Sequence, residues 1–389
     1  MKRTLLVTSA LLALAMSPAA AQNKTVKIGF VSTFSGPTAV IGNDMRNSLE
    51  LALDHMGRKM GGLPVEVIYE DDAQKPDVGL QKTQKLIQSD KVDFIAGYIW
   101  SNVLLASIKP IVDSKTFVVI SNAGATQIAG ELCSPYSYST SWTNDQNPRA
   151  VAEYMNKKGI KTVYLVGPNY AAGRENLAGL KDVFKGKIVG EDYTKWPDQL
   201  DFSAEMSKIR AANPEAVYTF YPGAAGVQFL NQYAQAGLQG KIPLYTTFVI
   251  DSLSLPRQKD AAVGVISALQ WTADLPNDAN KKFVADFKAR HKAEPSFYGA
   301  QTYDAANLIA SAVAAVKGDL SNKEAVQAAL KKADFKSVRG GFKFGNNNYP
   351  IQNFYMQEVV KDGDAYKLKT VATAMENAED PHHGKCPMK

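Results

Sequence analysis

Histidine and cysteine are scarce in this chain, and their scarcity restricts the chemistry that it can carry out. The 389 residues include four histidines and two cysteines. None of the motifs G-x-S-x-G, H-E-x-x-H, C-x-x-C and G-x-x-x-x-G-K-[ST] occurs. The sequence therefore lacks the marks of common hydrolases, metalloproteases, thiol oxidoreductases and P-loop nucleotide binders. We expect neither an enzymatic activity nor a cofactor.

A metal site is also not expected. His382, His383 and Cys386 lie close together in the sequence, which is the one place where metal ligands gather. A polar tail that ends in a disulfide explains these residues more simply.

Long apolar runs are rare, and the longest stands at the N-terminus. Lys2 and Arg3 precede an apolar stretch at residues 5–16, and small residues follow up to Ala21. This order predicts a secretory signal peptide over residues 1–21, cleaved after Ala21. No later run resembles a membrane-spanning helix. We therefore expect a soluble protein in the periplasm.

Charge of one sign does not accumulate along the chain. The formal net charge is +6, and residues 1–21 contribute two positive charges and no acids, so the mature chain carries 6 minus 2, or +4. Lysines and acids are interspersed along the chain without a basic run, so a nucleic-acid partner is not indicated. The hydrophobic fraction of 45% and the charged fraction of 21% are typical of a globular protein.

The two cysteines, Cys133 and Cys386, form an even pair in a chain that is expected to be exported. An oxidising compartment favours a disulfide between them, which would tie the C-terminus to the first third of the chain. Two unpaired thiols are the alternative.

What the chain contains in abundance is an alternation of short apolar runs with amphipathic stretches. This pattern predicts parallel sheets covered by helices. We expect strands at 26–32, 65–69, 92–96, 117–121, 162–166, 188–193, 217–221 and 244–247. We expect helices at 44–56, 78–88, 102–114, 147–158, 173–184, 202–212, 225–236, 280–291, 303–316 and 323–331. Asp77 and Asp201 are expected to cap two of these helices. The alternation restarts after Trp142, and the chain ends in strands at 341–344, 353–360 and 366–372, so two α/β lobes with a β-rich end are predicted.

Candidate binding residues cluster in loops that follow strands, where open α/β sheets bind ligands. These loops cover residues 32–37, 97–102, 121–126 and 168–173. Their neutral hydroxyl and amide groups, glycines and aromatic rings suit a small anionic ligand with apolar or aromatic character. The residues expected to contact it from this reasoning are Tyr98, Trp100, Ser101, Asn122, Gly124, Thr126, Tyr170, Phe220, Tyr221 and Phe248. Such residues are also common as caps, turns and core, which is the alternative for each.

Several short motifs, taken in order, give the chain a family resemblance. They are Ile28-Gly29-Phe30 running into Ser35-Gly36-Pro37, Glu70-Asp71-Asp72, Asn122-Ala123-Gly124, Asp201-Phe202-Ser203 and Tyr303-Asp304-Ala305-Ala306. With these motifs the chain resembles the branched-chain-amino-acid type of periplasmic binding protein that serves ABC transporters. The resemblance extends over nearly all of the mature sequence.

The resemblance implies a type I periplasmic binding protein fold. In that fold two Rossmann-like lobes are joined by a three-strand hinge and close like a Venus flytrap around a ligand in the central cleft. Lobe one would comprise residues 24–143 plus 272–340, and lobe two residues 144–271 plus 341–375. Residues 376–389 would form a C-terminal tail that returns to lobe one. The implied partner is an inner-membrane ABC permease, and the protein is expected to be a monomer.

The resemblance also assigns roles to individual residues. Trp100 and Ser101 match residues that line the cleft from lobe one. The loop Ala123-Gly124-Ala125-Thr126 matches the segment that receives a ligand carboxylate. Tyr170, Phe220, Tyr221 and Phe248 fall where lobe two closes over the ligand.

One departure from the family pattern bears on the substrate. Amino-acid binders usually place an acid in lobe two for the ligand's ammonium group, whereas this chain has Phe248 there and Asp251 three residues later. The run Cys133-Ser134-Pro135-Tyr136 with Cys386 looks like members that bind aromatic acids from plant breakdown. We therefore expect a benzoate- or cinnamate-like carboxylate. A branched-chain or other aliphatic amino acid, or a sensory module that docks on a receptor, are the alternatives.

Overall fold

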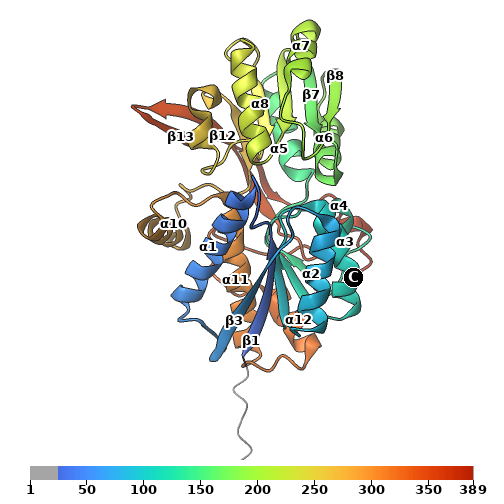
Figure 1. Cartoon of the computed structure of the whole chain (residues 1–389), viewed down its shortest axis with the longest axis vertical. Helices are drawn as coiled ribbons and strands as arrows, with labels where there is room; N and C mark the ends of the chain where they lie inside the picture. The colour runs from blue at the N-terminus through green and yellow to red at the C-terminus, as the bar shows by residue number, and fades with distance from the viewer. Residues whose placement is uncertain (1–24, 389) are drawn as a thin grey trace, which may run out of the picture.

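Two separate β-sheets organise the chain into two α/β lobes that follow one another along the long axis of the molecule (Figure 1). The computed structural model describes residues 25–388. The expected signal peptide and its cleavage site after Ala21 lie outside the described residues. The two-lobed α/β architecture predicted from the alternating pattern is confirmed.

The first sheet has six strands in the order β2-β3-β1-β4-β5-β6. Their bounds are Val26–Ser32 (β1), Lys59–Met60 (β2), Leu63–Asp71 (β3), Phe94–Gly97 (β4), Phe117–Ile120 (β5) and Ser137–Ser139 (β6). All neighbours are parallel except β2, which forms an antiparallel hairpin with β3. Strands β4 and β5 are buried over their whole length, because helices cover both faces of the sheet.

The helices of the first lobe come from two distant parts of the sequence. They are α1 (Ala39–His55), α2 (Pro76–Gln88), α3 (Ser101–Asp113), α4 (Thr126–Ala129), α10 (Asp278–His291), α11 (Phe297–Ala315) and α12 (Lys323–Lys332). Helices α10 to α12 follow most of the second lobe in the sequence but belong to the first lobe, where α11 packs against α1. In Figure 1 the orange α11 accordingly lies among the blue elements of the lower lobe.

The second sheet has seven strands in the order β13-β12-β11-β10-β9-β7-β8. Their bounds are Thr162–Pro168 (β7), Lys187–Thr194 (β8), Ala216–Phe220 (β9), Leu244–Thr247 (β10), Ile266–Leu269 (β11), Gln352–Asp362 (β12) and Ala365–Ala378 (β13). The covering helices are α5 (Gln146–Lys157), α6 (Ala171–Val183), α7 (Ser203–Ala212), α8 (Ala224–Gln235), α9 (Leu255–Gln258) and the 3-10 turn η1 (Lys259–Ala262). The long antiparallel hairpin β12–β13 closes one edge, and its turn falls at the expected Asp362-Gly363.

The chain passes between the lobes three times, between β6 and α5, between β11 and α10, and before β12. The crossings lie against one another. Gln352 Nε2 donates to Ser141 O at 2.9 Å, and the guanidinium of Arg339 donates to Thr140 O at 2.8 Å. The three connections expected at the hinge are therefore present side by side.

The segment before the third crossing differs from the expectation. Residues 341–344 form no strand, and only an isolated bridge joins Phe344 to Pro350. The amides of Asn347 and Asn348 donate to Ala129 O and to Ser137 O, both in the first lobe. Residues 345–349 thus pack on the first lobe, and the crossing lies near residue 350 rather than at 341. Buried hydrogen bonds of the Asn347 and Asn348 side chains fix this segment on the first lobe. Such long-range contacts cannot be predicted from the strand-like composition of the segment.

Smaller differences concern helix starts. Asp77 does not cap α2, because the helix begins with Pro76 at its first position, where the missing N–H of proline costs nothing. Asp201 does act at the start of α7, where its carboxylate accepts a hydrogen bond from Ser203 N at 2.9 Å. The short strands β6 and β11 were not expected from the sequence.

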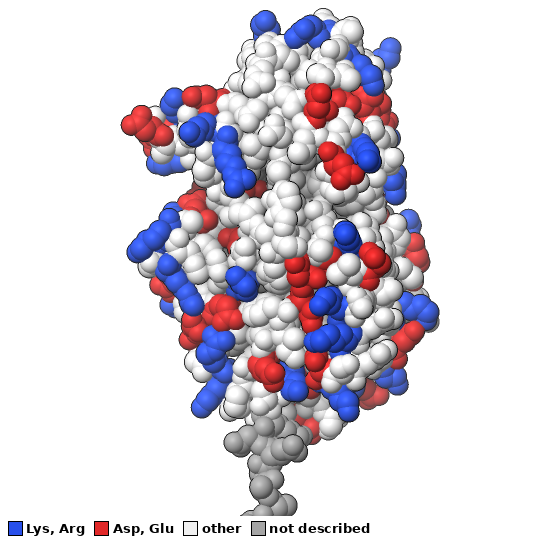
Figure 2. Space-filling view, in the orientation of Figure 1, with Lys and Arg blue, Asp and Glu red and all other residues white. Residues whose placement is uncertain are grey.

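The disulfide between Cys133 and Cys386 is confirmed, with 5.5 Å between the Cα atoms. It holds the C-terminal tail, which includes the turn η2 (His383–Lys385), against the first lobe. Among residues 25–388, no helix is long and apolar enough to span a bilayer. Figure 2 shows basic and acidic side chains interspersed over the face that it presents.

Candidate functional site

A pocket between the lobes gathers loops from both sheets. It lies where parallel strands β4 and β5 of the first lobe and β7, β9 and β10 of the second lobe end. The lining residues are Ile99, Trp100, Ser101, Asn122, Gly124, Trp142, Asn144, Tyr170, Ala172, Phe220, Pro222, Phe248 and Tyr298. Carboxyl ends of parallel strands meet at one edge of a sheet, and here the edges of two sheets face each other.

Aromatic rings from both lobes form the walls of this pocket. Trp142 stacks on Phe248, with 4.5 Å between ring centroids and 23° between planes. The lining rings of Tyr170 and Trp100, from opposite lobes, are joined by Trp196, which does not itself line the pocket: its ring centroid is 5.0 Å from that of Tyr170 and 5.7 Å from that of Trp100. Flat, stiff walls of this kind suit a planar apolar group.

The polar side chains of the pocket form a network across the lobe boundary. The amide of Asn144 donates to Ser101 Oγ at 2.9 Å and to Glu175 Oε2 at 2.7 Å. Glu175 Oε2 also accepts from the backbone N–H of Thr126 at 3.2 Å. Burial raises the pKa of Glu175, and its other oxygen, Oε1, has no hydrogen-bond partner.

Two hydrogen-bond donors in the pocket wall have no partner within the described residues. They are the indole Nε1–H of Trp142 and the hydroxyl of Tyr298, and both are buried. A buried donor left without an acceptor costs about 1–3 kcal/mol. Both groups are therefore ready to bind a ligand oxygen. The pocket lining contains no lysine, arginine or histidine.

A chain of buried amides links the pocket to the hinge. Asn122 Oδ1 accepts from Gln301 Nε2 at 3.0 Å, and Gln301 Oε1 accepts from Gln270 Nε2 at 3.1 Å. Gln270 Oε1 accepts from Asn147 Nδ2 at 3.2 Å. Asn122 lines the pocket, Gln270 lies on the second crossing and Asn147 lies in α5. The position of Asn122 is thereby tied to the geometry of the crossings.

Two bulky residues beside the pocket have left-handed backbone conformations. Tyr98, after β4, has φ +60°, and Phe248, after β10, has φ +57°. Non-glycine residues seldom adopt such angles, and when they do the site is often functional. At Phe248 this turn accompanies the contact of its ring with Trp142.

The structure brings together seven of the twelve residues expected to bind ligand: Trp100, Ser101, Asn122, Gly124, Tyr170, Phe220 and Phe248. The other five do not line the pocket. Tyr98 is buried in the first lobe, where its hydroxyl pairs with Thr83 Oγ1, and Tyr221 pairs with Thr194 Oγ1 in the second. Ala123 and Ala125 are buried, and the backbone N–H of Thr126 donates a hydrogen bond to Glu175 Oε2.

Six lining residues are not among the expected ones: Ile99, Ala172 and Pro222, and the larger or polar Trp142, Asn144 and Tyr298. Trp142 and Asn144 lie on the first crossing, and Tyr298 lies at the start of α11. Trp142 and Asn144 follow β6, a strand that the sequence did not predict, and Tyr298 follows no strand, so the rule that ligands bind after strands did not find these three. The only available signal was that Trp142 stands where the alternating pattern restarts.

Asp251, the alternative partner for a ligand ammonium group, is engaged elsewhere. It is buried, and its Oδ1 accepts from Leu253 N, Ser254 N and Ser254 Oγ within its own turn. Burial raises the pKa of its carboxyl group. Asp251 does not line the aromatic pocket.

A larger groove of about 680 Å³ lies between the lobes, beside α10 and the β12–β13 hairpin. It corresponds to the hollow at the left edge in Figure 2. Its walls mix apolar residues such as Trp271 and Leu368 with the charged Lys288, Lys292 and Glu294. The smaller pocket is the candidate ligand site, because the strand ends, the stacked rings and the residues with unpartnered donors converge there.

Comparisons with known proteins agree with this architecture. The sequence profile of the family described as periplasmic binding protein matches residues 25–364. A Leu/Ile/Val-binding protein homolog from Brucella melitensis biotype 1 is 29% identical, over 98% of this chain and 99% of the relative.

Two solved structures resemble the chain in sequence and in fold. One is an ABC transporter solute-binding protein from R. palustris in complex with benzoate. It is 32% identical with a TM-score of 0.89, over 94% of this chain and 100% of that one. The other, from Rhodopseudomonas palustris BisB5, is in complex with 3,4-dihydroxybenzoic acid. It is 30% identical with a TM-score of 0.86, over 92% of this chain and 99% of that one.

Proposed function

The chain belongs to the periplasmic binding protein family, and we propose that it captures a small aromatic carboxylate and delivers it to an ABC importer. The proposed ligand is of the benzoate or cinnamate type. It is proposed to bind in the pocket between the lobes, in the periplasm, with an inner-membrane permease as the partner.

The observation that carries this proposal is the pairing of aromatic walls with unpartnered donors in one buried pocket. Trp142 and Phe248 lie in contact, with 4.5 Å between ring centroids, so a ligand's benzene ring would bind by displacing one of them and replacing their contact with one of the same kind. The carboxylate oxygens are acceptors, and Trp142 Nε1–H and the Tyr298 hydroxyl are donors in need of one. Hydrogen bonds from neutral donors to a carboxylate are stronger than hydrogen bonds between neutral groups, so these two donors suit an anion.

Solved relatives support the same ligand class. The two structures described above contain benzoate and 3,4-dihydroxybenzoic acid, and a further R. palustris solute-binding protein, 27% identical to this chain, contains 4-hydroxybenzoate. The replacement of the expected acid by Phe248 also removes the natural partner for an ammonium group.

Closure of the lobes is the proposed mechanism of capture. Trp100 comes from the first lobe and Tyr170 from the second, so the pocket is complete only when the lobes meet. Ligand contacts made with both lobes favour the closed arrangement over an open one, and the three crossings supply the hinge.

An aliphatic amino acid is the second candidate, and one observation favours it. Glu175 Oε1 is buried beside the pocket network without a hydrogen-bond partner, as an ammonium-binding oxygen would be before ligand arrives. Relatives named Leu/Ile/Val-binding proteins are consistent with that ligand.

Calorimetric titration of the mature chain with benzoate, cinnamate, leucine and valine tests the proposal, supported by thermal unfolding with each ligand. We expect the aromatic acids to bind and to raise the melting temperature, and the amino acids to do neither. Benzamide, which keeps the ring and loses the charge, is the control for carboxylate recognition and is expected to bind at least tenfold more weakly.

Binding of leucine or valine alone would contradict the aromatic assignment. The Glu175→Gln variant then identifies the ammonium partner, since it would weaken amino-acid binding. If benzoate is the ligand, the same substitution leaves its affinity unchanged or improves it, because a buried negative charge near the anion is removed.

A further inference from the structure

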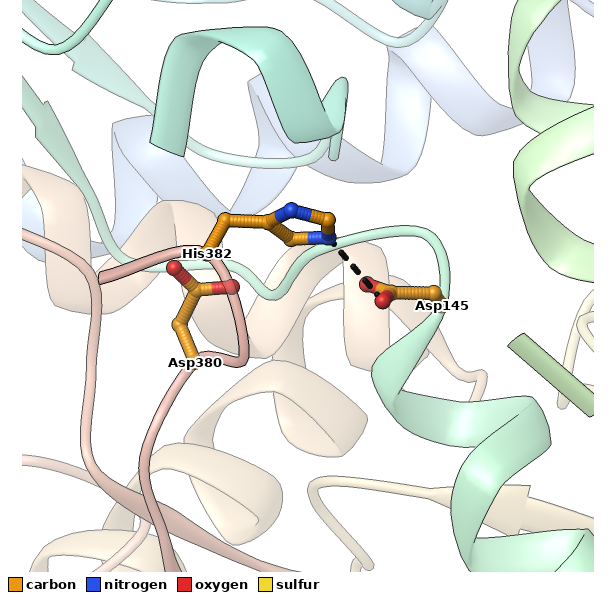
Figure 3. Close-up of side chains that lie close together, drawn as sticks. All are labelled: Asp145, Asp380 and His382. Atoms are coloured by element: carbon orange, nitrogen blue, oxygen red, sulfur yellow. Dashed lines mark hydrogen bonds and ion pairs between the residues drawn. The ribbon is translucent and has the colours of Figure 1, made fainter. Parts of the chain in front are cut away.

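Three polar side chains meet where the C-terminal tail crosses the start of α5 (Figure 3). Asp145 lies on the first crossing, immediately before α5, whereas Asp380 and His382 belong to the tail. The tail is held in place by the Cys133–Cys386 disulfide and by the amide of Asn347, which donates to Asp380 Oδ2. Residues 235 positions apart in sequence (380 minus 145) are thus fixed side by side.

The spacing of the three side chains suits a single cation. One ligand atom from each residue lies within 4.8 Å of the others, and His382 Nε2 is 3.0 Å from Asp145 Oδ2. Zinc binds histidine nitrogen and carboxylate oxygen at about 2.0–2.2 Å, so its ligand atoms are separated by roughly 3–4 Å. In Figure 3 the Asp145 carboxylate and the His382 ring point toward each other, with Asp380 beside them.

Two unpartnered oxygens point independently to a missing ligand. Oδ1 of Asp145 and Oδ1 of Asp380 have no hydrogen-bond partner, although these residues are only 4% and 1% exposed. The hydroxyl of Thr143 lies near both carboxyl groups and acts to lower the pKa of each, but it carries one proton and can donate to only one of them at a time. Burying carboxylate oxygens without donors is costly, and a bound cation would satisfy them.

We propose that Asp145, Asp380 and His382 form a binding site for a divalent transition-metal cation, with Zn²⁺ as the ion that this donor set fits best. Two carboxylates and one imidazole compensate a double positive charge. The imidazole nitrogen favours zinc over Mg²⁺ or Ca²⁺, which prefer oxygen ligands. The side chain of His382 is 17% exposed, which leaves an approach from solvent.

In the sequence, His382, His383 and Cys386 lie close together, and a polar tail that ends in a disulfide is their simpler interpretation. In the structure Cys386 forms the disulfide and is not available as a ligand, whereas Asp145, which is far away in the sequence, lies beside Asp380 and His382. Without a metal, His382 forms an ion pair with Asp145, which also contacts Arg149 Nε at 3.2 Å. The proposed cation would take the place of the His382 proton in that pair.

A cation in this site would link the C-terminal tail to the second lobe. Asp145 leads into α5 of the second lobe, whereas the tail is bonded to Cys133 of the first. A cation bound by both therefore stabilises the folded chain in the arrangement seen here.

Zinc titration of the untagged, chelator-treated mature chain by calorimetry tests the proposal, with the disulfide left oxidised. We expect one equivalent of Zn²⁺ to bind and to raise the melting temperature. His382→Gln and Asp380→Asn are each expected to weaken binding at least about tenfold. His383→Gln is the matched control, because His383 is the next residue and does not belong to the cluster, and its variant should bind zinc as the wild type does.

Absorption of the Co²⁺-loaded wild-type chain tests the same ligand set without any substitution, so poor folding of a variant would not obscure the answer. Visible bands of a low-symmetry nitrogen and oxygen site are expected. The proposal is overturned if the wild type binds no zinc at a concentration of about 10⁻⁴ M, because even a weak site would be detected there. It is equally overturned if His382→Gln and His383→Gln bind zinc alike. Neither result would affect the proposed ligand pocket, which contains none of these residues.

Discussion

At the scale of single residues, the buried polar atoms without partners carry most of the functional information. Trp142 Nε1 and the Tyr298 hydroxyl are such atoms, and both belong to residues that line the interlobe pocket. Folding alone gives no reason to bury a donor without an acceptor, because the group forfeits its bonds to water. Ligand binding gives such a reason.

Tyr298→Phe is predicted to weaken benzoate binding about tenfold, which corresponds to one hydrogen bond of about 1–1.5 kcal/mol. The free energy of unfolding of the ligand-free variant should stay the same or rise, because an unsatisfied group is removed. Calorimetric titration and urea unfolding measure the two quantities. Tyr233→Phe is the control, since the Tyr233 hydroxyl donates to Ile242 O away from the pocket, and it should lose stability and keep affinity. Equal affinity of Tyr298→Phe and wild type would exclude Tyr298 from carboxylate recognition.

Asp44 is predicted to make stability depend on pH. Burial raises its pKa from 3.8 to about 7, and Asp251 of the second lobe adds to the shift. Between these values the folded chain keeps a proton that the unfolded chain has lost, so the free energy of unfolding falls as pH rises from 4 to 7. Asp44→Asn removes this dependence. We therefore expect the free energy of unfolding of the variant, relative to that of the wild type, to rise by about 4 kcal/mol between pH 4 and pH 8.

Denaturant unfolding of both proteins at each pH measures that difference. Because all other titrating groups are common to the two chains, their contributions cancel in the comparison. Parallel stability curves for wild type and Asp44→Asn would show that Asp44 is ionised normally in the folded protein.

At the scale of secondary-structure elements, both lobes use glycine to bring a helix onto the end of the preceding strand. A Cβ on Gly42 of α1 would lie 2.0 Å from Thr33 O, and a Cβ on Gly173 of α6 would lie 1.9 Å from Pro168 O. In each case the obstacle is a backbone carbonyl, which cannot move aside as a side chain can. The close approach holds the loops after β1 and β7 against their helices.

Gly173→Ala is therefore predicted to destabilise the chain by about 1–3 kcal/mol through overpacking. Because α6 also carries Ala172 of the pocket lining, ligand affinity should fall as well. Gly341→Ala is the matched control, since a Cβ there has open space. Equal urea midpoints for Gly173→Ala and Gly341→Ala would contradict this prediction, because they would show that α6 can move away from Pro168 without loss of stability.

At the scale of the whole molecule, Arg339 joins the first lobe to two of the three crossings. Its guanidinium pairs with Asp304, donates to Thr140 O of the first crossing and donates to Gln352 Oε1 at the third. Arg339 and Asp304 are both buried, with side chains 6% and 0% exposed. The hinge is thus built around a desolvated ion pair.

Arg339→Met is predicted to cost about 3–5 kcal/mol of stability, because Asp304 is left as an uncompensated buried charge. The double variant Asp304→Leu with Arg339→Met should recover most of the loss, since no charge then remains buried. Urea unfolding of the three proteins provides the comparison. A double variant no more stable than the single one would mean that Arg339 acts mainly through its bonds to the crossings.

Local patterns in the amino-acid sequence were enough to predict the α/β class, the family, the pairing of the cysteines and the loops expected to carry the site. Periodicity and strand-end composition are local properties, which explains why β1 was predicted at its observed bounds and why Trp100, Tyr170 and Phe248 were chosen. The cysteine pairing followed from compartment and number rather than from geometry.

Which side chains meet across the two lobes depends instead on how the folded chain packs. Trp142, Asn144 and Tyr298 complete the pocket from the first crossing and from α11, and Asp145 meets the tail at Asp380 and His382. Residues that stand at expected strand ends, such as Tyr221, instead point into the core of one lobe. These outcomes depend on how two lobes and three crossings pack together, and contacts between residues far apart in sequence leave no local pattern.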